Sequence, residues 1–424
     1  MHPHFVNRAD GDYTCITRRA TRKAAKRNKT GLERYDARIE QAVKILEAGT
    51  VQPTMMREFD FLLASVRRYF RPECPPPSKE GLDWNLILEL AHRHAVAGFL
   101  RLTYDDPALM SDALKSAQSA LATSAELTKL ANLFNQERID VVPLKGPVLG
   151  VALYQDEALK VSTDLDLLVR PSDALRAKRL VESIGYSLMT VPHWPMGKAC
   201  LRNVNDELSF RDPGHWLKLD LHWSLLHSYF PCPFKEIELW SRVGSIPWGG
   251  TRVRILSPED QLMFLCGHGA KHLWARLGWL CDLARLIQLE QGIDWSEIFD
   301  RTRRSDTTRI VLLGLVLADN LLGVEFPPAA AALVDADLQV RVLAAEVLER
   351  LRTGRPASQV ATALFCMRVL ERNGYRARLL LGMFVQPTEA EYRVVQLPPA
   401  LYWVYYLLRP LRLAVKYARR LCGL

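Results

Sequence analysis

The sequence has no paired cysteines, no apolar leader and no internal repeat, and each absence narrows the classes of protein to consider. Its eight cysteines are scattered over 424 residues, and no two of them form a CxxC pair. A disulfide framework or a cysteine-based zinc site is therefore not expected, and a reducing compartment such as the cytoplasm is the simpler interpretation. The N-terminus shows no apolar run followed by a small-residue cleavage site, so we do not expect secretion.

Acidic residues are too few to balance the basic ones. The chain holds 56 Lys and Arg against 47 Asp and Glu, a net charge of +9, and residues 1–30 carry eight Lys or Arg against two Asp. We expect this basic segment to be a disordered tail. It could be simply solvated, or it could contact nucleic acid or anionic lipid.

The hydrophobic pattern divides the rest of the chain into three regions. Residues 31–135 show apolar residues at helical spacing, residues 136–255 alternate between strands and helices, and residues 256–424 are helical again. The middle region is therefore an α/β or α+β unit, and we expect the two outer regions to be mainly helical.

Turn and capping residues bound the individual elements. We expect helices over 84–100, 111–136 and 172–184, and strands over 139–144, 164–169, 186–190, 207–211 and 216–223. Ser257 is a suitable N-cap for a further helix, and Pro258 suits its first position.

Three aspartates in the middle region have the pattern of a metal site. Asp164 and Asp166 are two residues apart on a predicted strand, so both carboxylates project to one face. Asp220 lies on a second alternating strand, where Lys218, Asp220 and His222 share one face. Carboxylates are costly to bury without a cation, and hard oxygen ligands suit Mg²⁺. If the two strands are neighbours, the carboxylates converge and can hold two metal ions about 3.5–4 Å apart.

A lysine and a glycine form a candidate phosphate site upstream of these acids. Lys145-Gly146 ends a predicted strand, and Pro147 follows where the first turn of a helix tolerates it. A glycine at such a junction lets backbone N–H groups approach a phosphate, and the start of the helix attracts its charge. Lys145 adds a mobile positive charge for a triphosphate.

These motifs, taken in order, resemble those of the uncharacterised bacterial nucleotidyltransferase family of the DNA polymerase β superfamily. The shared order is Leu-Lys-Gly at 144–146, a tyrosine-bearing helix, Asp-Leu-Asp-Leu-Leu-Val at 164–169 and Leu-Asp-Leu-His-Trp at 219–223. The similarity continues through Gly185-Tyr186, Leu-Ser-Pro-Glu-Asp at 256–260 and the helix with His268, His272 and Asp282, and it spans roughly residues 90–300.

The resemblance implies an α+β fold: a polymerase β-like nucleotidyltransferase core, with a small mixed sheet and helices, flanked by helical N- and C-terminal regions. It implies that Asp164, Asp166 and Asp220 bind two Mg²⁺ or Mn²⁺ ions and transfer a nucleoside monophosphate from an NTP, such as ATP, to an acceptor. It also implies that Gly146 faces the triphosphate, with Lys145 beside it. The acceptor itself is not identified by the sequence. We expect it in the cleft between the catalytic and C-terminal regions.

The chain departs from the superfamily pattern at three places. Pro147 stands where Ser or Gly usually follows the glycine, and it has no N–H to offer. The interval between Gly146 and Asp164 is longer than usual, and Lys160 stands where relatives often carry Arg. These departures keep a second hypothesis open: a catalytically silent module on the same fold that senses a nucleotide or binds a partner.

Three histidines and a lysine are candidates for contacts with the acceptor or the cleft. His268 and His272 are four residues apart on a predicted helix, with Lys271 between them. They could line the cleft, form a hydrogen-bonded polar patch or bind zinc, although no glutamate follows His268 as in metalloproteases. His222 could orient the acceptor, serve as a base or be an ordinary strand histidine.

The C-terminal segment, residues 397–424, combines aromatic and basic residues. Its first part is rich in leucine, tyrosine and tryptophan, and five Lys or Arg follow between Arg409 and Arg420. The apolar run is too short to span a bilayer. The segment could lie on anionic lipid or nucleic acid, which in the first case would make the protein peripheral to a membrane, or it could pack on the protein as a terminal helix. We favour the packed helix.

Overall fold

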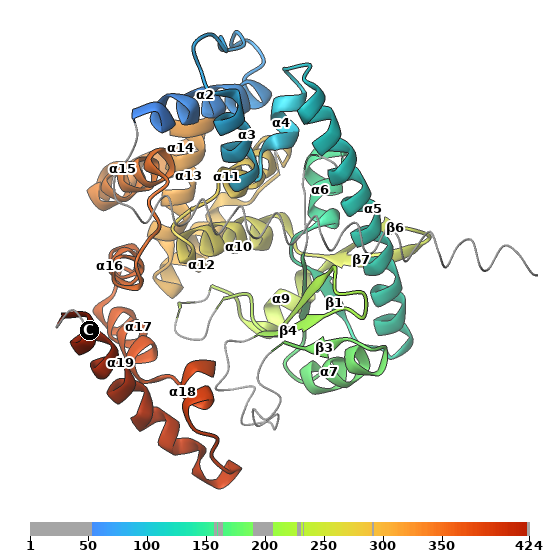
Figure 1. Ribbon diagram of the computed structural model, residues 1–424, viewed down its shortest axis with the longest axis vertical. Helices are drawn as coiled ribbons and strands as arrows, with labels where there is room; N and C mark the ends of the chain where they lie inside the picture. The colour runs from blue at the N-terminus through green and yellow to red at the C-terminus, as the bar shows by residue number, and fades with distance from the viewer. Residues whose placement is uncertain are drawn as a thin grey trace, which may run out of the picture.

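The computed structural model describes residues 53–156, 159, 164–189, 207–226, 230, 231, 233–290 and 292–421. The predicted basic tail and Lys160 lie outside the described residues. In the described part of the chain, helices surround a five-stranded sheet and a two-stranded hairpin (Figure 1). The predicted α+β class is confirmed.

Helices precede the sheet, as the apolar spacing predicts. They are α2 (Pro53–Phe70), α3 (Trp84–Arg93), α4 (Ala97–Arg101) and α5 (Pro107–Gln136). The side chains of Asp83 and Asp106 accept hydrogen bonds from the first backbone N–H groups of α3 and α5, which fixes where these helices begin. The prediction of one helix over 84–100 is wrong, because the chain turns at Ala95, whose φ is +55°.

The sheet has the strand order β1–β2–β5–β4–β3. Its strands are β1 (Val141–Pro143), β2 (Asp164–Val169), β3 (Ser187–Leu188), β4 (Glu207–Arg211) and β5 (Lys218–His222). β2 and β5 are parallel and the other neighbours are antiparallel, so the sheet is mixed, as predicted. β3 and β5 are shorter than the strands predicted over 186–190 and 216–223.

Three helices and a hairpin complete the described part of the middle region. α6 (Pro147–Tyr154) follows β1, and α7 (Ala174–Ser183) follows β2 and begins later than the predicted start at Ser172. After α9 (Glu236–Arg242), the hairpin of β6 (Gly244–Trp248) and β7 (Thr251–Ile255) packs against β1 and α5.

The chain then continues through helices to the end of the described residues. The first set comprises α10 (Pro258–Lys271), α11 (Leu277–Leu289), α12 (Trp295–Ser305), α13 (Thr308–Leu322), α14 (Pro328–Ala336) and α15 (Leu338–Thr353). The predicted start of α10 is confirmed: Pro258 is its first residue, and the Ser257 side chain accepts a hydrogen bond from the Asp260 N–H.

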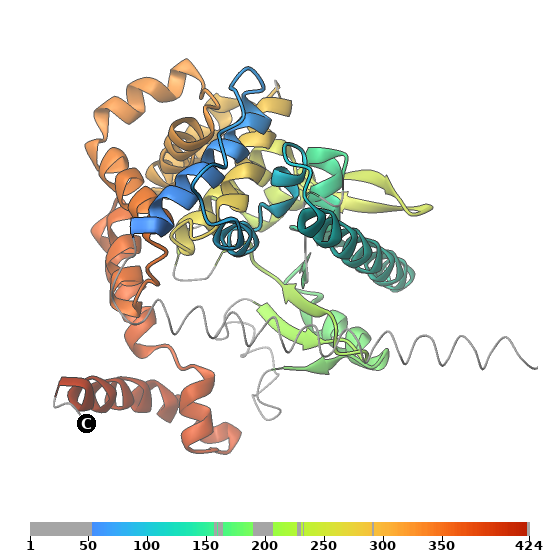
Figure 2. The same ribbon diagram turned by 45° about the horizontal axis from the view of Figure 1, so that its top comes forward.

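The last elements form an arm that extends away from the other helices (Figures 1 and 2). They are α16 (Gln359–Val369), α17 (Asn373–Val385), α18 (Glu389–Val394), the 3₁₀ helix η2 (Pro399–Val404) and α19 (Tyr405–Leu421). None of the helices in the described ranges is both long and apolar enough to cross a membrane.

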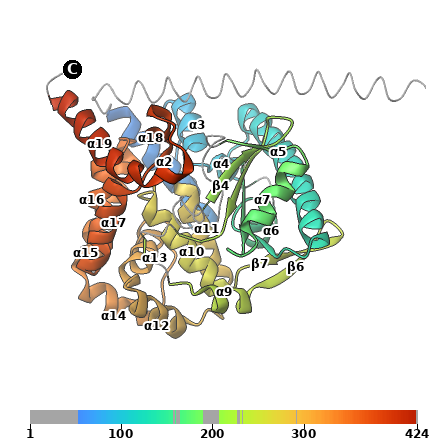
Figure 3. The same cartoon turned by 90° about the horizontal axis from the view of Figure 1, so that it is seen from below.

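Two hydrophobic cores position the elements around the sheet. One face of the sheet packs on α5 and α7 in a core that contains Leu165, Leu167, Leu219 and Leu221, all fully buried. The larger core joins α2–α4 to α10–α15, so helices from both ends of the chain lie together on the other side of the sheet (Figure 3). The predicted domain boundaries stay predictions.

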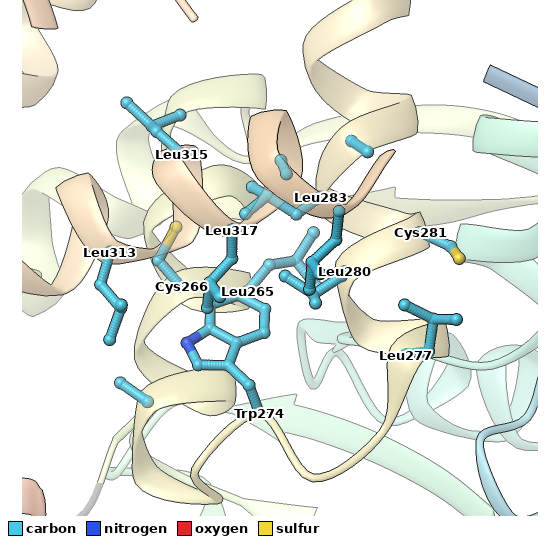
Figure 4. Packing of buried hydrophobic residues seen from close by; sticks show 14 of the residues in the cluster. Leu265, Cys266, Trp274, Leu277, Leu280, Cys281, Leu283, Leu313, Leu315 and Leu317 are labelled. Atoms are coloured by element: carbon cyan, nitrogen blue, oxygen red, sulfur yellow. The ribbon is translucent and has the colours of Figure 1, made fainter. Parts of the chain in front are cut away.

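Trp274 fixes the turn between α10 and α11. It is fully buried, and Figure 4 shows it among the leucines and Cys266 of the larger core. A Cβ atom at Gly269 would lie 2.5 Å from atoms of the Trp274 ring, so only glycine lets the ring pack this closely on α10. This packing places the end of α10 and the start of α11 opposite the sheet.

Candidate active site

The parallel pair of β2 and β5 brings the three predicted aspartates to one face of the sheet. Asp166 lies beside Asp220 in the register, and Asp164 lies beside Lys218. Residues in register on neighbouring strands point to the same face. All three aspartates line one pocket. We call this side of the pocket the sheet wall, which consists of Lys145, Asp164, Asp166, Glu207, Lys218, Asp220 and His222.

Two aspartates of the sheet wall are buried, and each is paired with a lysine. Asp166 is 5% exposed and Asp220 is 6% exposed. Lys145 Nζ lies 3.2 Å from both carboxylate oxygens of Asp166. Lys218 Nζ donates to Asp220 Oδ2 at 2.7 Å, and Ser209 Oγ donates to Asp220 Oδ1 at 2.5 Å. The lysines therefore neutralise carboxylates that would otherwise be costly to bury.

The pairing of Asp166 determines its ionisation. Burial by itself would raise the pKa of this carboxyl, but the charge of Lys145 and the hydrogen bond from His222 outweigh burial and hold the pKa below its usual range. Burial likewise works against the charge of Lys218, but the hydrogen bond to Asp220 raises the pKa of this amine above its ordinary value. Asp166 and Lys218 of the sheet wall thus stay charged.

His222 connects Asp166 to the neighbouring strand β4. Its Nε2 lies 3.0 Å from Asp166 Oδ1, and its Nδ1 lies 3.3 Å from Glu207 Oε2. Both contacts can be hydrogen bonds at once only when both ring nitrogens carry hydrogen. Of the roles considered from the sequence, this geometry favours positioning over that of a base.

Gly146 makes the turn from which Lys145 reaches the aspartates. Its φ of +76° lies in the region that favours glycine, and it precedes Pro147, the first residue of α6. The Leu144 N–H donates to the Asp166 carbonyl oxygen at 2.9 Å, which holds the end of β1 beside β2. Both Lys145 and Gly146 line the pocket, as their predicted role at a phosphate requires.

The opposite side of the pocket comes from the end of α10 and the start of α11. The ring centroids of His268 and His272 are 4.7 Å apart, and the Trp279 ring lies 4.9 Å from the first and 5.6 Å from the second. The Arg276 guanidinium lies 5.8 Å from the centre of the Trp279 ring. We call this side the helical wall, which consists of His268, Lys271, His272, Arg276 and Trp279.

The two histidines of the helical wall are neutral at neutral pH. Burial, followed by the charge of Lys145, lowers the pKa of His268 well below its ordinary value. Burial, followed by the charge of Lys271, lowers the pKa of His272 to about 4, although this side chain is open to the pocket. Among the residues that the structure describes, no three His, Cys, Asp or Glu side chains are placed to hold a metal ion together. The zinc hypothesis for His268 and His272 therefore lacks a third ligand among these residues.

A buried hydrogen bond joins the two sides of the pocket. Tyr154 Oη, at the end of α6, donates to Asp282 Oδ1 of α11 at 3.1 Å. Burial, followed by the charge of Asp282, raises the pKa of Tyr154 well above its ordinary value, so this phenol stays protonated.

The pocket between the walls has a volume of about 440 Å³, which is large enough for a small molecule or part of a nucleotide.

The pocket collects every candidate that the sequence singled out. Those residues are Lys145, Gly146, Asp164, Asp166, Asp220, His222, His268, Lys271 and His272. Sequence reasoning did not nominate Glu207, Lys218, Arg276 or Trp279. Alternation along β5 already places Lys218 on the face of Asp220. Glu207 depends on the register of β4, and the other two depend on the turn after α10, so no sequence signal identified them.

Comparison with known proteins adds a family but no characterised relative. No curated protein and no solved structure matches the chain. The sequence profile of a family described as "uncharacterised nucleotidyltransferase" matches residues 80–323, which is more than half of the chain and includes both walls of the pocket. The chain therefore belongs to this family of uncharacterised nucleotidyltransferases.

Proposed function

We propose that the protein moves a nucleoside monophosphate from an NTP to an acceptor, with Mg²⁺ or Mn²⁺ held by Asp164, Asp166 and Asp220. The observation that carries the proposal is the register of β2 and β5, which sets buried Asp166 beside buried Asp220 at the pocket. Lys145 reaches the same place from the Gly146 turn. Membership of a nucleotidyltransferase family supports the same class of reaction.

The donor atoms of the sheet wall suit a hard divalent cation. Asp164, Asp166 and Asp220 offer carboxylate oxygens, which Mg²⁺ prefers, and the two buried carboxylates need positive charge beside them. In the structure Lys145 and Lys218 supply that charge, and the three carboxylates, like the other acidic and histidine side chains described, are not placed to hold a metal ion together. The proposal therefore requires that the flexible lysine side chains turn toward a triphosphate and that the carboxylates draw together around the metal. A bound Mg²⁺ would neutralise phosphate charge and polarise the α-phosphorus.

The proposed reaction is a displacement at the α-phosphorus. The acceptor oxygen forms a bond to this phosphorus while the bond to the bridging oxygen of the β-phosphate breaks, and pyrophosphate leaves with the electron pair. The proton of the acceptor passes to a carboxylate of the pocket. The sheet wall would hold the triphosphate, with Lys145 as its cation. The helical wall presents Trp279 with Lys271 and Arg276, which suits a planar or anionic part of a substrate.

A transfer assay tests the proposal. The purified protein is incubated with Mg²⁺ and each NTP labelled at the α-phosphate, with cell extract as the pool of acceptors. We expect label to move to a product with the wild type and not with Asp164→Asn/Asp166→Asn. Asp140→Asn is the matched control, because this carboxylate pairs with Arg170 and Arg254 away from the pocket. Equal transfer by the double variant would refute the assignment.

A second candidate function is a silent module that binds a nucleotide without turning it over. The lysines that neutralise Asp166 and Asp220, together with the missing N–H of Pro147, favour it. It predicts NTP binding by titration calorimetry that needs the same aspartates, with no transfer of label to any acceptor. Such a result would replace the enzyme proposal with the sensing module.

A further inference from the structure

Helix α19 presents an apolar face to solvent and turns Arg409 and Arg412 toward the protein. Every residue of α19 that is exposed, among those whose burial the structure describes, is apolar: Leu407, Pro410, Leu411, Ala414, Val415 and Ala418. Leu407, Leu411 and Val415 are 57%, 63% and 53% exposed, and their spacing of four residues forms one continuous stripe. This is the reverse of an ordinary surface helix, which buries its apolar stripe.

Ion pairs fix this orientation. Glu391 of α18 is only 1% exposed, and it accepts hydrogen bonds from Arg412 and from Arg409, the latter at 3.2 Å. The same carboxylate accepts from the Thr388 N–H at 2.8 Å. Burial opposes its ionisation, but these donors, led by the Thr388 N–H, lower the pKa of Glu391 to about 2. Arg409 and Arg412 are therefore held inward at neutral pH, and the apolar stripe faces out.

An exposed helix elsewhere in the molecule shows what is unusual about α19. On α5, Met110, Leu114 and Leu121 are 55%, 62% and 67% exposed. Their exposed neighbours on that helix include Ser111, Lys115 and other polar residues, which keep the face hydrated. The outward face of α19 has no polar residue among those described. The elements that contact α19 also carry exposed aromatic and aliphatic side chains: Trp403 of η2 is 60% exposed, and Phe384 and Leu381 of α17 are 51% and 64% exposed.

We propose that the outward face of α19, with Trp403, docks on a bilayer surface that carries anionic headgroups. A helix with one apolar and one basic face lies in the interface with its apolar side at the headgroup and acyl boundary, and Trp is favoured at that depth. The segment from Leu397 to Leu424 contains five Lys or Arg and no Asp or Glu. Arg409 and Arg412 pair with Glu391, and Lys416, Arg419 and Arg420 add the positive charge that complements anionic lipid. The same charge disfavours pairing with a second copy, because two such segments repel each other.

Vesicle flotation with the full chain tests this surface. Phosphatidylcholine vesicles with and without phosphatidylglycerol are compared for the wild type and for Leu407→Ser/Leu411→Ser/Val415→Ser. We expect the wild type to float with the anionic vesicles, and the triple variant to bind them roughly a hundredfold more weakly, because three exposed aliphatic side chains lose their contact with lipid. Met110→Ser/Leu114→Ser/Leu121→Ser on α5 is the matched control and should bind as the wild type does.

A second readout keeps the result separate from folding and from catalysis. Brominated acyl chains should quench part of the tryptophan fluorescence of the wild type, and Trp403→Phe should remove that part without changing flotation more than a few-fold. No binding to either kind of vesicle would overturn the proposal. So would a dimer in analytical ultracentrifugation that only the α19 triple variant dissolves, because a second copy would then cover the face.

Discussion

The two walls of the pocket stabilise their ionisable side chains in opposite ways. The sheet wall pairs its buried carboxylates with cations, Lys145 with Asp166 and Lys218 with Asp220. The helical wall keeps its imidazoles neutral and packs them on Trp279. The stability of the sheet wall therefore depends on both partners of each ion pair, whereas that of the helical wall depends on its histidines staying unprotonated. The pocket therefore offers buried ion pairs on one side and, on the other, neutral rings packed on Trp279 with Lys271 and Arg276 beside them.

The largest expected difference between the walls is in the free energy of unfolding that is lost when one lysine of each wall is replaced. Lys145→Met removes the lysine beside the buried Asp166 carboxylate, which keeps its contact with His222 Nε2, so we expect the free energy of unfolding to fall by about 3 kcal/mol. Lys271→Met on the helical wall should change it by less than about 1 kcal/mol, because this side chain is only half-buried. Urea unfolding measures both. Equal losses would show that pairing does not distinguish the walls.

The next largest difference between the walls should appear in how the free energy of unfolding depends on pH. An unfolded histidine takes up a proton below about pH 6.5, but folded His268 does not, because its pKa is lowered. The unfolded state then binds more protons, so stability is fully present above that pH and falls as the pH drops, by up to about 1.4 kcal/mol per unit for each such histidine. Asp166, whose folded pKa is also lowered, loses its contribution only at more acidic pH, below about 3.9.

Two substitutions check this assignment in the window between about pH 4 and 6.5. His268→Gln should flatten the fall in unfolding free energy. His94→Gln should do the same, because burial, followed by the charge of Arg93, lowers the pKa of His94 to about 3. His94 also accepts a hydrogen bond from the Leu277 N–H at the start of α11, so it supports the helical wall from behind. A slope identical to that of the wild type in both variants would contradict neutral imidazoles.

The smallest expected effect concerns the aromatic surface of the helical wall. Under the proposed function, Trp279→Leu removes a ring that faces the pocket, and KM for the NTP or the acceptor should rise about fivefold to tenfold with a smaller change in kcat. Trp295→Leu is the control, because Trp295 stacks on Phe299 of α12 and does not line the pocket. Unchanged KM values in Trp279→Leu would confine substrate contacts to the sheet wall.

Much of the sheet wall could be predicted from the sequence, because side chains on a strand alternate with a period of two. That period places Asp164 with Asp166 on β2, and Lys218 with Asp220 on β5. It does not give the register between strands that are far apart along the chain. Glu207 was missed for that reason, since its place beside His222 follows only from the pairing of β4 with β5.

The amino-acid sequence by itself determined the faces of the strands and the amphipathic character of α19, because these depend on local periodicity, and its resemblance to a known family implied the fold class. Only the tertiary structure decided how those faces meet. Trp274 packs on Gly269 and turns the helical wall toward the aspartates, and the buried Glu391 carboxylate draws the arginines of α19 inward. Both choices depend on contacts between different helices. Periodicity within one helix locates its two faces, but the partners that bury one of them decide which face is left to bind something else.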